Sequence, residues 1–326
     1  MVPLDLAVPD PRAPAGRLWA VGHLTVDDVV LPDGVCHMAT AGGAALYAAV
    51  GARLAGTAST LVSRRGEGIP ASTVERLAEL HIDAQLVGTE APAITQWVLY
   101  ETDGSRTYLT HPGSGTYDQM SPVPDEHRLF LGAAVHLAPM PISAQAAWVH
   151  ALQGRATVSL DPHHDSARGC PEEVLTVLPS LAAFLPSEGE SRDLAGPDPV
   201  AALRAYRAAG VPLAVVKLGA EGSLVAADDG IWHVPAVPAR VVDVTGAGDS
   251  YCGAFCATLA RGEHPLTAAR WAAAAASVVV ECLGALLDPD VLRSGVVRDR
   301  FLAVEPVRVD GSPPRERPTR SDREAV

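Results

Sequence analysis

Residues 241–250 read Val241-Val242-Asp243-Val244-Thr245-Gly246-Ala247-Gly248-Asp249-Ser250. The two β-branched residues at the start predict the end of a buried strand, and the small residues after them predict a tight turn. Good helix formers fill positions 251–261, so Asp249 and Ser250 stand at the start of a helix. The first N–H groups of a helix have no internal partner, and small residues ahead of them let a phosphate approach the backbone. The stretch therefore predicts an anion site with a carboxylate beside it.

Two interpretations of Asp249 follow from this pattern. A carboxylate beside an anion site can take the proton from a hydroxyl that attacks a phosphate. The same residue could be an ordinary helix N-cap, with Gly246 and Gly248 as ordinary loop glycines. The stretch is not a Walker loop, because no Gly-Lys-Ser/Thr follows, and it is not a Gly-x-Gly-x-x-Gly fingerprint.

The run Asp-Val-Thr-Gly-Ala-Gly-Asp-Ser resembles the carboxy-terminal signature of the ribokinase (PfkB) family of sugar and nucleoside kinases. The resemblance implies that Asp249 is the catalytic base. It also implies that the amides of Gly246, Ala247 and Gly248 form the anion hole for the transferred phosphoryl group. By the same resemblance, Thr245 lies at the nucleotide and Asp243 lies near a monovalent cation such as K⁺.

Composition limits the other classes of function. The chain has 326 residues, 48% hydrophobic, and a net charge of −13, which argues against nucleic-acid and membrane-surface partners. Residues 1–16 are rich in proline and lack the basic start and apolar block of a signal peptide, so we expect a cytoplasmic protein. Five scattered cysteines indicate free thiols, and Cys252 and Cys256 are expected to be small core residues.

Strands and helices alternate along most of the chain. The pattern predicts strands at 17–22, 57–63, 133–138, 156–160 and 212–217, with helices at 41–56, 69–80, 143–152, 171–178, 200–209 and 266–283. Such alternation indicates a parallel sheet covered on both faces. Pro-Asp-Gly at 32–34 and Asp-Gly at 103–104 predict two hairpins, over 25–39 and 94–110, that build a small separate sheet.

The resemblance supplies a fold for these elements. It implies an α/β, ribokinase-like three-layer sandwich with a mainly parallel central sheet and a small β lid near 25–40 and 94–110. We expect one kinase domain at 17–304, a disordered leader at 1–16 and a disordered tail at 305–326. The lid is expected to cover the substrate and could form a homodimer face. Trp97 and Tyr108 could stack on a substrate or partner there, and Arg106 has weaker grounds for a ligand role.

The acceptor site is expected near the start of the chain. Asp27 is placed at a strand end, and it follows Gly22 at the spacing of the family's sugar-binding aspartate. Gly42 and Gly43 open a helix and resemble the glycines that let a sugar lie against the main chain. Tyr47 stands where many members have an asparagine that contacts the sugar, so the resemblance places ordinary ribose or fructose in question.

The nucleotide and Mg²⁺ sites are expected from later segments. Lys217 ends a strand that leads into Leu218-Gly219-Ala220-Glu221-Gly222, which resembles a turn near the nucleotide phosphates, and Gly284 falls at the adenine edge. Pro186-Ser187-Glu188-Gly189-Glu190 resembles a segment whose glutamate organises water around Mg²⁺, so Glu190 is a metal candidate, although a solvated loop is the alternative. Asp161-Pro162-His163-His164-Asp165 is interpreted as a loop near the substrate rather than a metal site, since adjacent residues rarely face one ion.

The sequence therefore predicts an enzyme that uses ATP and Mg²⁺ to phosphorylate a hydroxyl of a sugar or sugar-like small molecule. A nucleoside kinase or a kinase of a polyol such as inositol would share every motif. A catalytically idle binding protein on the same fold is the alternative from another class, although a costly carboxylate at an anion site argues against it.

Overall fold

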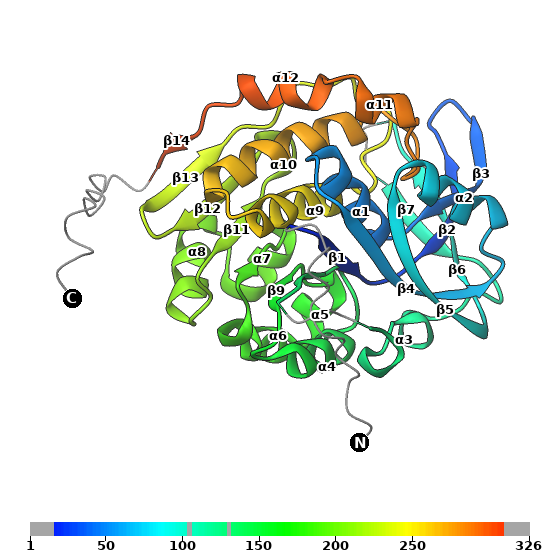
Figure 1. Ribbon diagram of the computed structural model, residues 1–326, viewed down its shortest axis with the longest axis horizontal. Coiled ribbons are helices and arrows are strands. Elements are labelled where there is room, and N and C mark those ends of the chain that lie inside the picture. Colours follow the sequence, from blue (N-terminus) through cyan, green and yellow to red (C-terminus); the bar gives the residue numbers. More distant parts are fainter. Residues whose placement is uncertain (1–15, 103–105, 129–131, 310–326) are drawn as a thin grey trace.

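The computed structural model describes residues 16–102, 106–128 and 132–309, which form two sheets and the helices around them (Figure 1). The large sheet has the strand order β14-β13-β12-β11-β10-β9-β8-β1-β4-β5, and the small sheet has the order β3-β2-β6-β7. The large sheet comprises β1 (Leu18–Val21), β4 (Ser59–Glu67), β5 (Ile82–Pro92), β8 (Ala134–Leu137), β9 (Thr157–Leu160), β10 (Ala183–Phe184), β11 (Ala214–Lys217), β12 (Ser223–Ala227), β13 (Gly230–Val234) and β14 (Val307–Arg308). The small sheet comprises β2 (Thr25–Val30), β3 (Cys36–Gly42), β6 (Ile94–Tyr100) and β7 (Arg106–Thr110).

The large sheet is mainly parallel, as the alternating pattern predicts. Every neighbouring pair in the order β11-β10-β9-β8-β1-β4-β5 is parallel, and the pairs β11–β12, β12–β13 and β13–β14 at one edge are antiparallel. Short strands with helical crossovers give this arrangement because each crossover returns the chain to the same end of the sheet.

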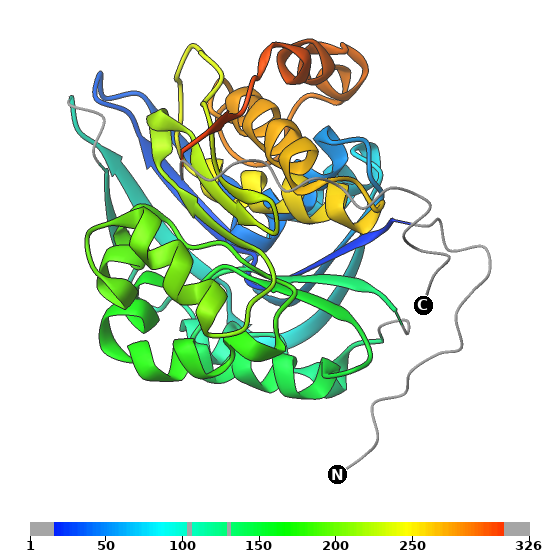
Figure 2. The same ribbon diagram turned by 90° about the vertical axis from the view of Figure 1, so that its left-hand side faces the viewer.

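Two helical layers cover the sheet (Figure 2). The first contains α1 (Ala44–Leu54), α2 (Ala71–Glu79), α9 (Ala247–Ala260), α10 (Pro265–Val279), α11 (Pro289–Arg293) and α12 (Val296–Ala303), and the second contains α4 (Ile142–Leu152), α5 (His164–Gly169), α6 (Pro171–Thr176), α7 (Glu188–Ala195) and α8 (Pro199–Ala208). Strand β1 alternates between the two cores, since Leu18 and Ala20 pack with the first layer while Trp19 and Val21 pack with the second. The three-layer α/β architecture is thus confirmed.

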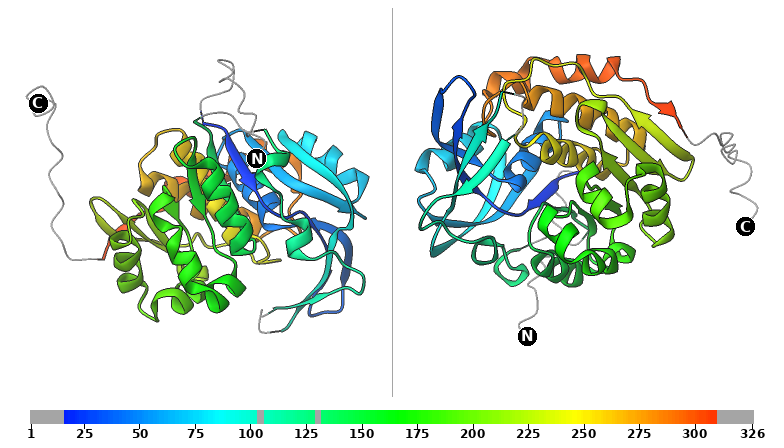
Figure 3. Two further views of the ribbon diagram at one scale, coloured as in Figure 1. Left: turned by 90° about the horizontal axis from the view of Figure 1, so that it is seen from below. Right: turned by 180° about the vertical axis from the view of Figure 1, so that it is seen from behind.

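The small sheet stands at one end of the molecule (Figure 3, right). The two expected hairpins are present, because β2 pairs antiparallel with β3 and β6 pairs antiparallel with β7, while β2 and β6 join them in parallel. The turn at 103–104 lies outside the described residues. The short helix α3 (Tyr117–Met120) follows β7 and begins at a capping box built by Thr116 and Gln119.

Several sequence expectations are wrong in detail. Val241 and Val242 are 61% and 39% exposed and belong to no strand; the N–H of Val242 instead donates to the carbonyl of Val280 at 2.7 Å. The sheet edge beyond β13 is occupied by β14 rather than by residues 241–242. Strand β14 itself falls in the segment expected to be a disordered tail, whose residues after 309 lie outside the described part, as do residues 1–15 of the leader.

Three further segments differ from the expectations. Strand β5 was not among the expected strands, although Ile82, Ala84 and Leu86 alternate with Asp83 and Gln85, and it pairs with β4 over most of its length. His164 begins helix α5, and Glu190 lies in helix α7 rather than in a loop. In the described residues, no helix combines the length and apolarity that a membrane span needs.

Candidate active site

Helix α9 begins at Ala247, immediately after Gly246, and no side chain caps its first turn. Gly246 has a φ of 72°, a left-handed conformation that suits glycine. Helix formation also begins earlier than the sequence suggests, because the small residues 247–250 already take helical geometry. Amides without a side-chain cap and the dipole of a helix of this length favour an anion at its N-terminus, although the N–H of Ala247 already donates to the carbonyl of Val244 at 3.3 Å.

Tyr47 packs directly beneath this turn. Its side chain is 2% exposed, and a Cβ placed on Gly246 would lie 2.1 Å from ring carbons of Tyr47. Burial raises the pKa of the Tyr47 hydroxyl well above its usual value, and the carboxylates of Asp243 and Asp27 add to the effect. The aromatic ring therefore supports the turn from the core, which is the role of Tyr47 that the contacts show.

We expect Gly246→Ala to destabilise the protein through both backbone strain and overlap with Tyr47. The left-handed backbone costs about 1–2 kcal/mol, and the overlap adds about 1–3 kcal/mol. Gly262→Ala is a matched control, since Gly262 follows the other end of α9 with a φ of 79° and open space where a Cβ would stand. Urea unfolding of the two variants measures the difference. Equal losses would show that the Tyr47 ring is no obstacle.

Asp249 lies in the first turn of α9, beside the uncapped amides. Burial raises the pKa of its carboxyl group, while the charges of Lys217 and Arg106 oppose that rise. Several charged or titratable groups from other parts of the fold interact electrostatically with Asp249, so that its pKa or theirs is shifted. They are Lys217, Glu190, Arg106, Asp161, Tyr108 and Tyr47. A carboxylate held at this point by opposing cations and burial is suited to accept a proton.

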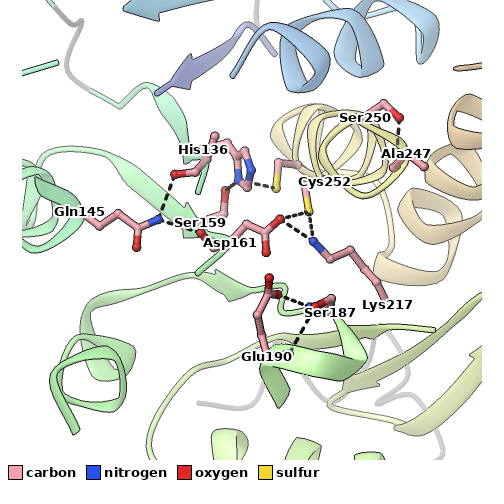
Figure 4. Close-up of polar contacts among 12 residues, drawn as sticks. His136, Gln145, Ser159, Asp161, Ser187, Glu190, Lys217, Ala247, Ser250 and Cys252 are labelled. Atoms are coloured by element: carbon pink, nitrogen blue, oxygen red, sulfur yellow. Dashed lines mark hydrogen bonds and ion pairs between the residues drawn. The ribbon is translucent and has the colours of Figure 1, made fainter. Parts of the chain in front are cut away.

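Lys217, at the end of β11, forms a buried ion pair with Asp161 at the end of β9 (Figure 4). The ammonium Nζ also lies 3.4 Å from Sγ of Cys252, and it is 3.5 Å from the point where a Cβ of Gly248 would stand. Burial raises the pKa of Asp161, against the attraction of Lys217, whose own pKa stays high beside that carboxyl group. The second oxygen of Asp161, Oδ1, is buried without a hydrogen-bond partner.

Glu190 lies next to this ion pair, at the start of α7 (Figure 4). It forms a capping box, because the N–H of Ser187 donates to Oε2 of Glu190 at 2.6 Å and the N–H of Glu190 donates to Oγ of Ser187 at 3.4 Å. The alternative of a solvated loop is therefore wrong. Ser187, which replaces the asparagine of the resembling motif, serves as the helix cap.

Asp243 is 1% exposed and its carboxylate is almost saturated with hydrogen bonds. Oδ1 accepts from the hydroxyl of Tyr100 and from the N–H of Thr245 at 2.7 Å, and Oδ2 accepts from the N–H of Gly284 at 3.3 Å. The hydroxyls of Tyr100 and Thr245 lie 2.9 Å apart. Among the described residues, Oδ2 has only the long hydrogen bond from Gly284, and the K⁺ ion expected near Asp243 remains a prediction.

The expected acceptor residues gather where the small sheet meets β1 and α1. Asp27 lies within β2 rather than at a strand end, and its Oδ1 accepts from Thr25 at 2.9 Å and from Gln96 at 3.0 Å. Burial raises the pKa of Asp27 to about 6. A Cβ on Gly42 would lie 2.1 Å from Oδ2 of Asp27, and a Cβ on Gly43 would lie 2.3 Å from the carbonyl oxygen of His23. Both glycines thus make room for neighbouring protein atoms.

The glycines expected at the nucleotide have different surroundings. Gly222 has a φ of 95°, and a Cβ there would lie 2.1 Å from the carbonyl oxygen of Val234, so its place is structural. Gly219 faces open space within 4 Å, and Gly284 approaches Thr40. The turn around Gly219 is therefore the one with free volume beside it.

The sequence did not identify several residues that the fold brings to the site. Asp161, Gln96 and Tyr100 come from three segments far from 243–250 in the chain. Of these, Asp161 lies in the segment 161–165 that the sequence analysis had already placed near the substrate, directly after a buried parallel strand. His163, His164 and Asp165 do have donor atoms within 4.8 Å of one another, contrary to the argument from adjacency. The N–H of Asp165 donates to Nδ1 of His163, which serves as the cap of α5.

Comparison with known proteins agrees with this geometry. The chain is 29% identical over 252 residues to a cytidine kinase of Thermococcus kodakarensis, covering 75% of this chain and 89% of the relative. It is 27% identical over 279 residues to a nucleoside kinase of Methanothermobacter thermautotrophicus, covering 81% and 89%. A fructokinase of Vibrio cholerae, crystallised with fructose, ADP and calcium, superposes with a TM-score of 0.69 at 21% identity, over 86% of this chain and 98% of that one.

The fold and these relatives define a ribokinase-like kinase of small molecules. The chain belongs to the pfkB family of carbohydrate kinases, whose sequence model matches residues 28–290.

Proposed function

We propose that the protein transfers the γ-phosphoryl group of ATP to a hydroxyl of a sugar moiety, with Asp249 as general base. The observation that carries the proposal is the position of Asp249 in the first turn of the uncapped helix α9. The charge of Lys217 there lowers the pKa of Asp249 against the effect of burial. Few structural roles require a buried carboxylate at a site built to attract anions.

The proton and the developing charge are assigned to groups of this chain. Asp249 takes the proton of the acceptor hydroxyl as its oxygen attacks the phosphorus. The backbone amides of Gly246, Ala247 and Gly248 donate hydrogen bonds to the phosphoryl oxygens, and Lys217 adds a positive charge from beneath. Such fixed donors need no reorganisation during the reaction, which is why they lower its barrier.

The described residues also fit Mg²⁺, which prefers oxygen ligands and retains several waters. Oδ1 of Asp161 lacks a hydrogen-bond partner, and the Glu190 carboxylate is close enough to raise the pKa of Asp161. These two carboxylates would hold the ion, Glu190 through water. When bound, Mg²⁺ neutralises charge on the phosphates. We assign the nucleotide to the open turn at Gly219, near Gly222, Thr245 and Gly284.

The acceptor is assigned to the side of the Asp27 carboxylate that carries Oδ2. Oδ2 of Asp27 is free to accept from a sugar hydroxyl because Gly42 leaves room beside it, while Thr25 and Gln96 fix the orientation of the carboxylate. Gly43 precedes the first turn of α1, whose amides can meet further hydroxyls. Tyr47 is placed beneath this acceptor site. The assignment of Asp27, Gly42 and Gly43 concerns the sugar ring alone.

A nucleoside is the second candidate acceptor. A cluster of aromatic side chains near Asp27, formed by Tyr117, His23 and His163, favours it. Tyr117 lies with its ring centroid 5.0 Å from that of His23 and 5.4 Å from that of His163. The hydroxyl of Tyr117 reaches Oε1 of Gln96 at 3.4 Å, and Gln96 in turn donates to Asp27. A base attached to a sugar held at Asp27 would meet these rings, which suit stacking. The cytidine and nucleoside kinases among the relatives support the same candidate.

The first experiment is ADP release from Mg-ATP with a panel of pentoses, hexoses, inositols and nucleosides. A kinase is expected to respond strongly to one class, and the class decides between a free sugar and a nucleoside. Replacement of Tyr117 by alanine then separates the candidates further, since it should raise KM for a nucleoside and leave KM for a free sugar almost unchanged. Silence across the panel with ATP bound would contradict the proposal.

A further inference from the structure

The inner face of the small sheet carries residues that its pairing brings together over the active site. Gln96 and Tyr100 of β6 share one face, because side chains two apart on a strand point the same way. Gln96 donates to Asp27, so this is the face that looks toward the acceptor. On β7, Arg106 pairs with Tyr100 and Tyr108 pairs with Val98, so both project from the same inner face.

Tyr100 fixes this face to the signature turn. Its hydroxyl donates to Asp243 and lies 2.9 Å from the hydroxyl of Thr245. Arg106 is paired with Tyr100 in the strand register, and its Cζ stands 5.6 Å from the ring centroid of Tyr108. The Arg106 guanidinium is therefore held above the turn at 243–250 and within electrostatic range of Asp249.

The charge of Arg106 has no carboxylate partner at this place. Burial works against that charge, but Tyr108 and Tyr100 hold the pKa of Arg106 above its usual value, and within the described part of the chain none of the ion pairs involves Arg106. By contrast, Lys217 is already paired with Asp161. A guanidinium that stays charged without a carboxylate partner can pair with an anion that arrives at the site.

We propose that Arg106 is a catalytic residue that binds the phosphoryl group from the small-sheet side while it is transferred. This inference rests on the proposed phosphoryl transfer. In the transition state the negative charge spreads over the three equatorial oxygens, and a guanidinium can donate two parallel hydrogen bonds to such oxygens. Lys217 and the α9 amides meet the group from one side and Arg106 meets it from the other. No additional reactant is required, because Arg106 only donates hydrogen bonds.

The test compares Arg106→Ala and Arg106→Lys with the full-length wild-type protein, using the best acceptor of the panel. We expect kcat of Arg106→Ala to fall by about 10²–10³-fold, as for removal of one charge-stabilising donor, with KM for the acceptor little changed. Arg106→Lys should recover part of the loss, because an ammonium keeps the charge without the paired donors. Arg204→Ala, an exposed arginine on α8, is the control and should match the wild type.

Two readouts separate this role from a merely structural one. Mg-ADP with aluminium fluoride and the acceptor mimics the transferring phosphoryl group, and its stabilisation of the protein against heat should be lost in Arg106→Ala, while stabilisation by Mg-ADP alone should persist. Removing Arg106 also removes a charge that lowers the pKa of Asp249, so the acid limb of the rate profile should move to higher pH.

The outcomes are distinct. Full turnover in Arg106→Ala, or a raised KM for the acceptor with kcat unchanged, would overturn the inference, the second result placing Arg106 at the acceptor instead. Failure of the proposed function would show itself differently, as a wild-type protein that is inert with every acceptor.

Discussion

Asp249→Asn should leave Mg-ATP binding intact and lower kcat by about 10²–10⁴-fold, the range expected for the loss of a general base. The substitution keeps the shape of the side chain and removes its ability to take a proton. Asn also fits the first turn of α9, so the helix and its amides should remain in place. Single-turnover phosphoryl transfer measures the loss, and isothermal titration with Mg-ATP measures the retained binding.

Asp299→Asn is the matched control. Asp299 also lies in the first turn of a helix that follows a left-handed glycine, since α12 begins after Gly295 with a φ of 76°. It differs in belonging to α12, the outer helix of the first layer (Figure 1). Normal turnover is expected of Asp299→Asn. Unchanged turnover in Asp249→Asn as well would refute the assignment of the base.

The pH dependence provides a second check on Asp249. Burial raises the pKa of its carboxyl group, so the base becomes protonated at a higher pH than an ordinary aspartate would. Activity should therefore be present above the raised pKa and lost as the pH falls through it. The acid limb of kcat/KM in the wild type should lie above the usual aspartate value, and Asp249→Asn should abolish that limb in its residual activity.

The sequence predicted the parts of the fold that local pattern controls. Small residues and glycines at 246–248 decide where α9 begins, and apolar runs such as 17–22 decide the buried central strands. The same reasoning failed at Val241 and Val242, where β propensity did not produce a strand, and the alternation at 82–86 in β5 was missed. Pairing of strands is decided by the whole sheet, and neither propensity nor alternation encodes it.

In the candidate site, too, local features could be predicted from the sequence and contacts between distant residues could not. Residues of the signature turn stand together in the chain, so their proximity could be predicted. The contacts of Tyr100 with Asp243 and of Lys217 with Asp161 join residues separated by 143 and 56 positions. Tyr47 stands where the resembling motif has a sugar-contacting asparagine. In the structure its ring is packed under Gly246, and the motif alone could not predict that contact.

Removing the ammonium of the buried ion pair should be the most destabilising of the changes considered. Lys217→Met fills a similar volume and leaves the Asp161 carboxylate buried without its partner. Loss of one member of a buried pair costs about 3–5 kcal/mol, and turnover should also collapse because the anion hole loses a cation. Urea unfolding near neutral pH measures the stability, and ADP release measures the activity.

Two further variants test whether the instability of Lys217→Met comes from breaking the buried ion pair with Asp161. Arg207→Met breaks an ion pair with Asp228, whose side chain is 92% exposed, and should cost no more than about 1 kcal/mol. The double variant Lys217→Met with Asp161→Asn removes the buried carboxyl group, whose pKa burial raises and whose cost grows as the pH rises. It should therefore be more stable than Lys217→Met alone, which would show that the ion pair can be replaced for stability. Because Asp161 is itself assigned to Mg²⁺, the effect of the Lys217 charge on turnover is measured in Lys217→Met alone. If the double variant were no more stable than the single one, the stranded carboxylate would not be the source of the instability.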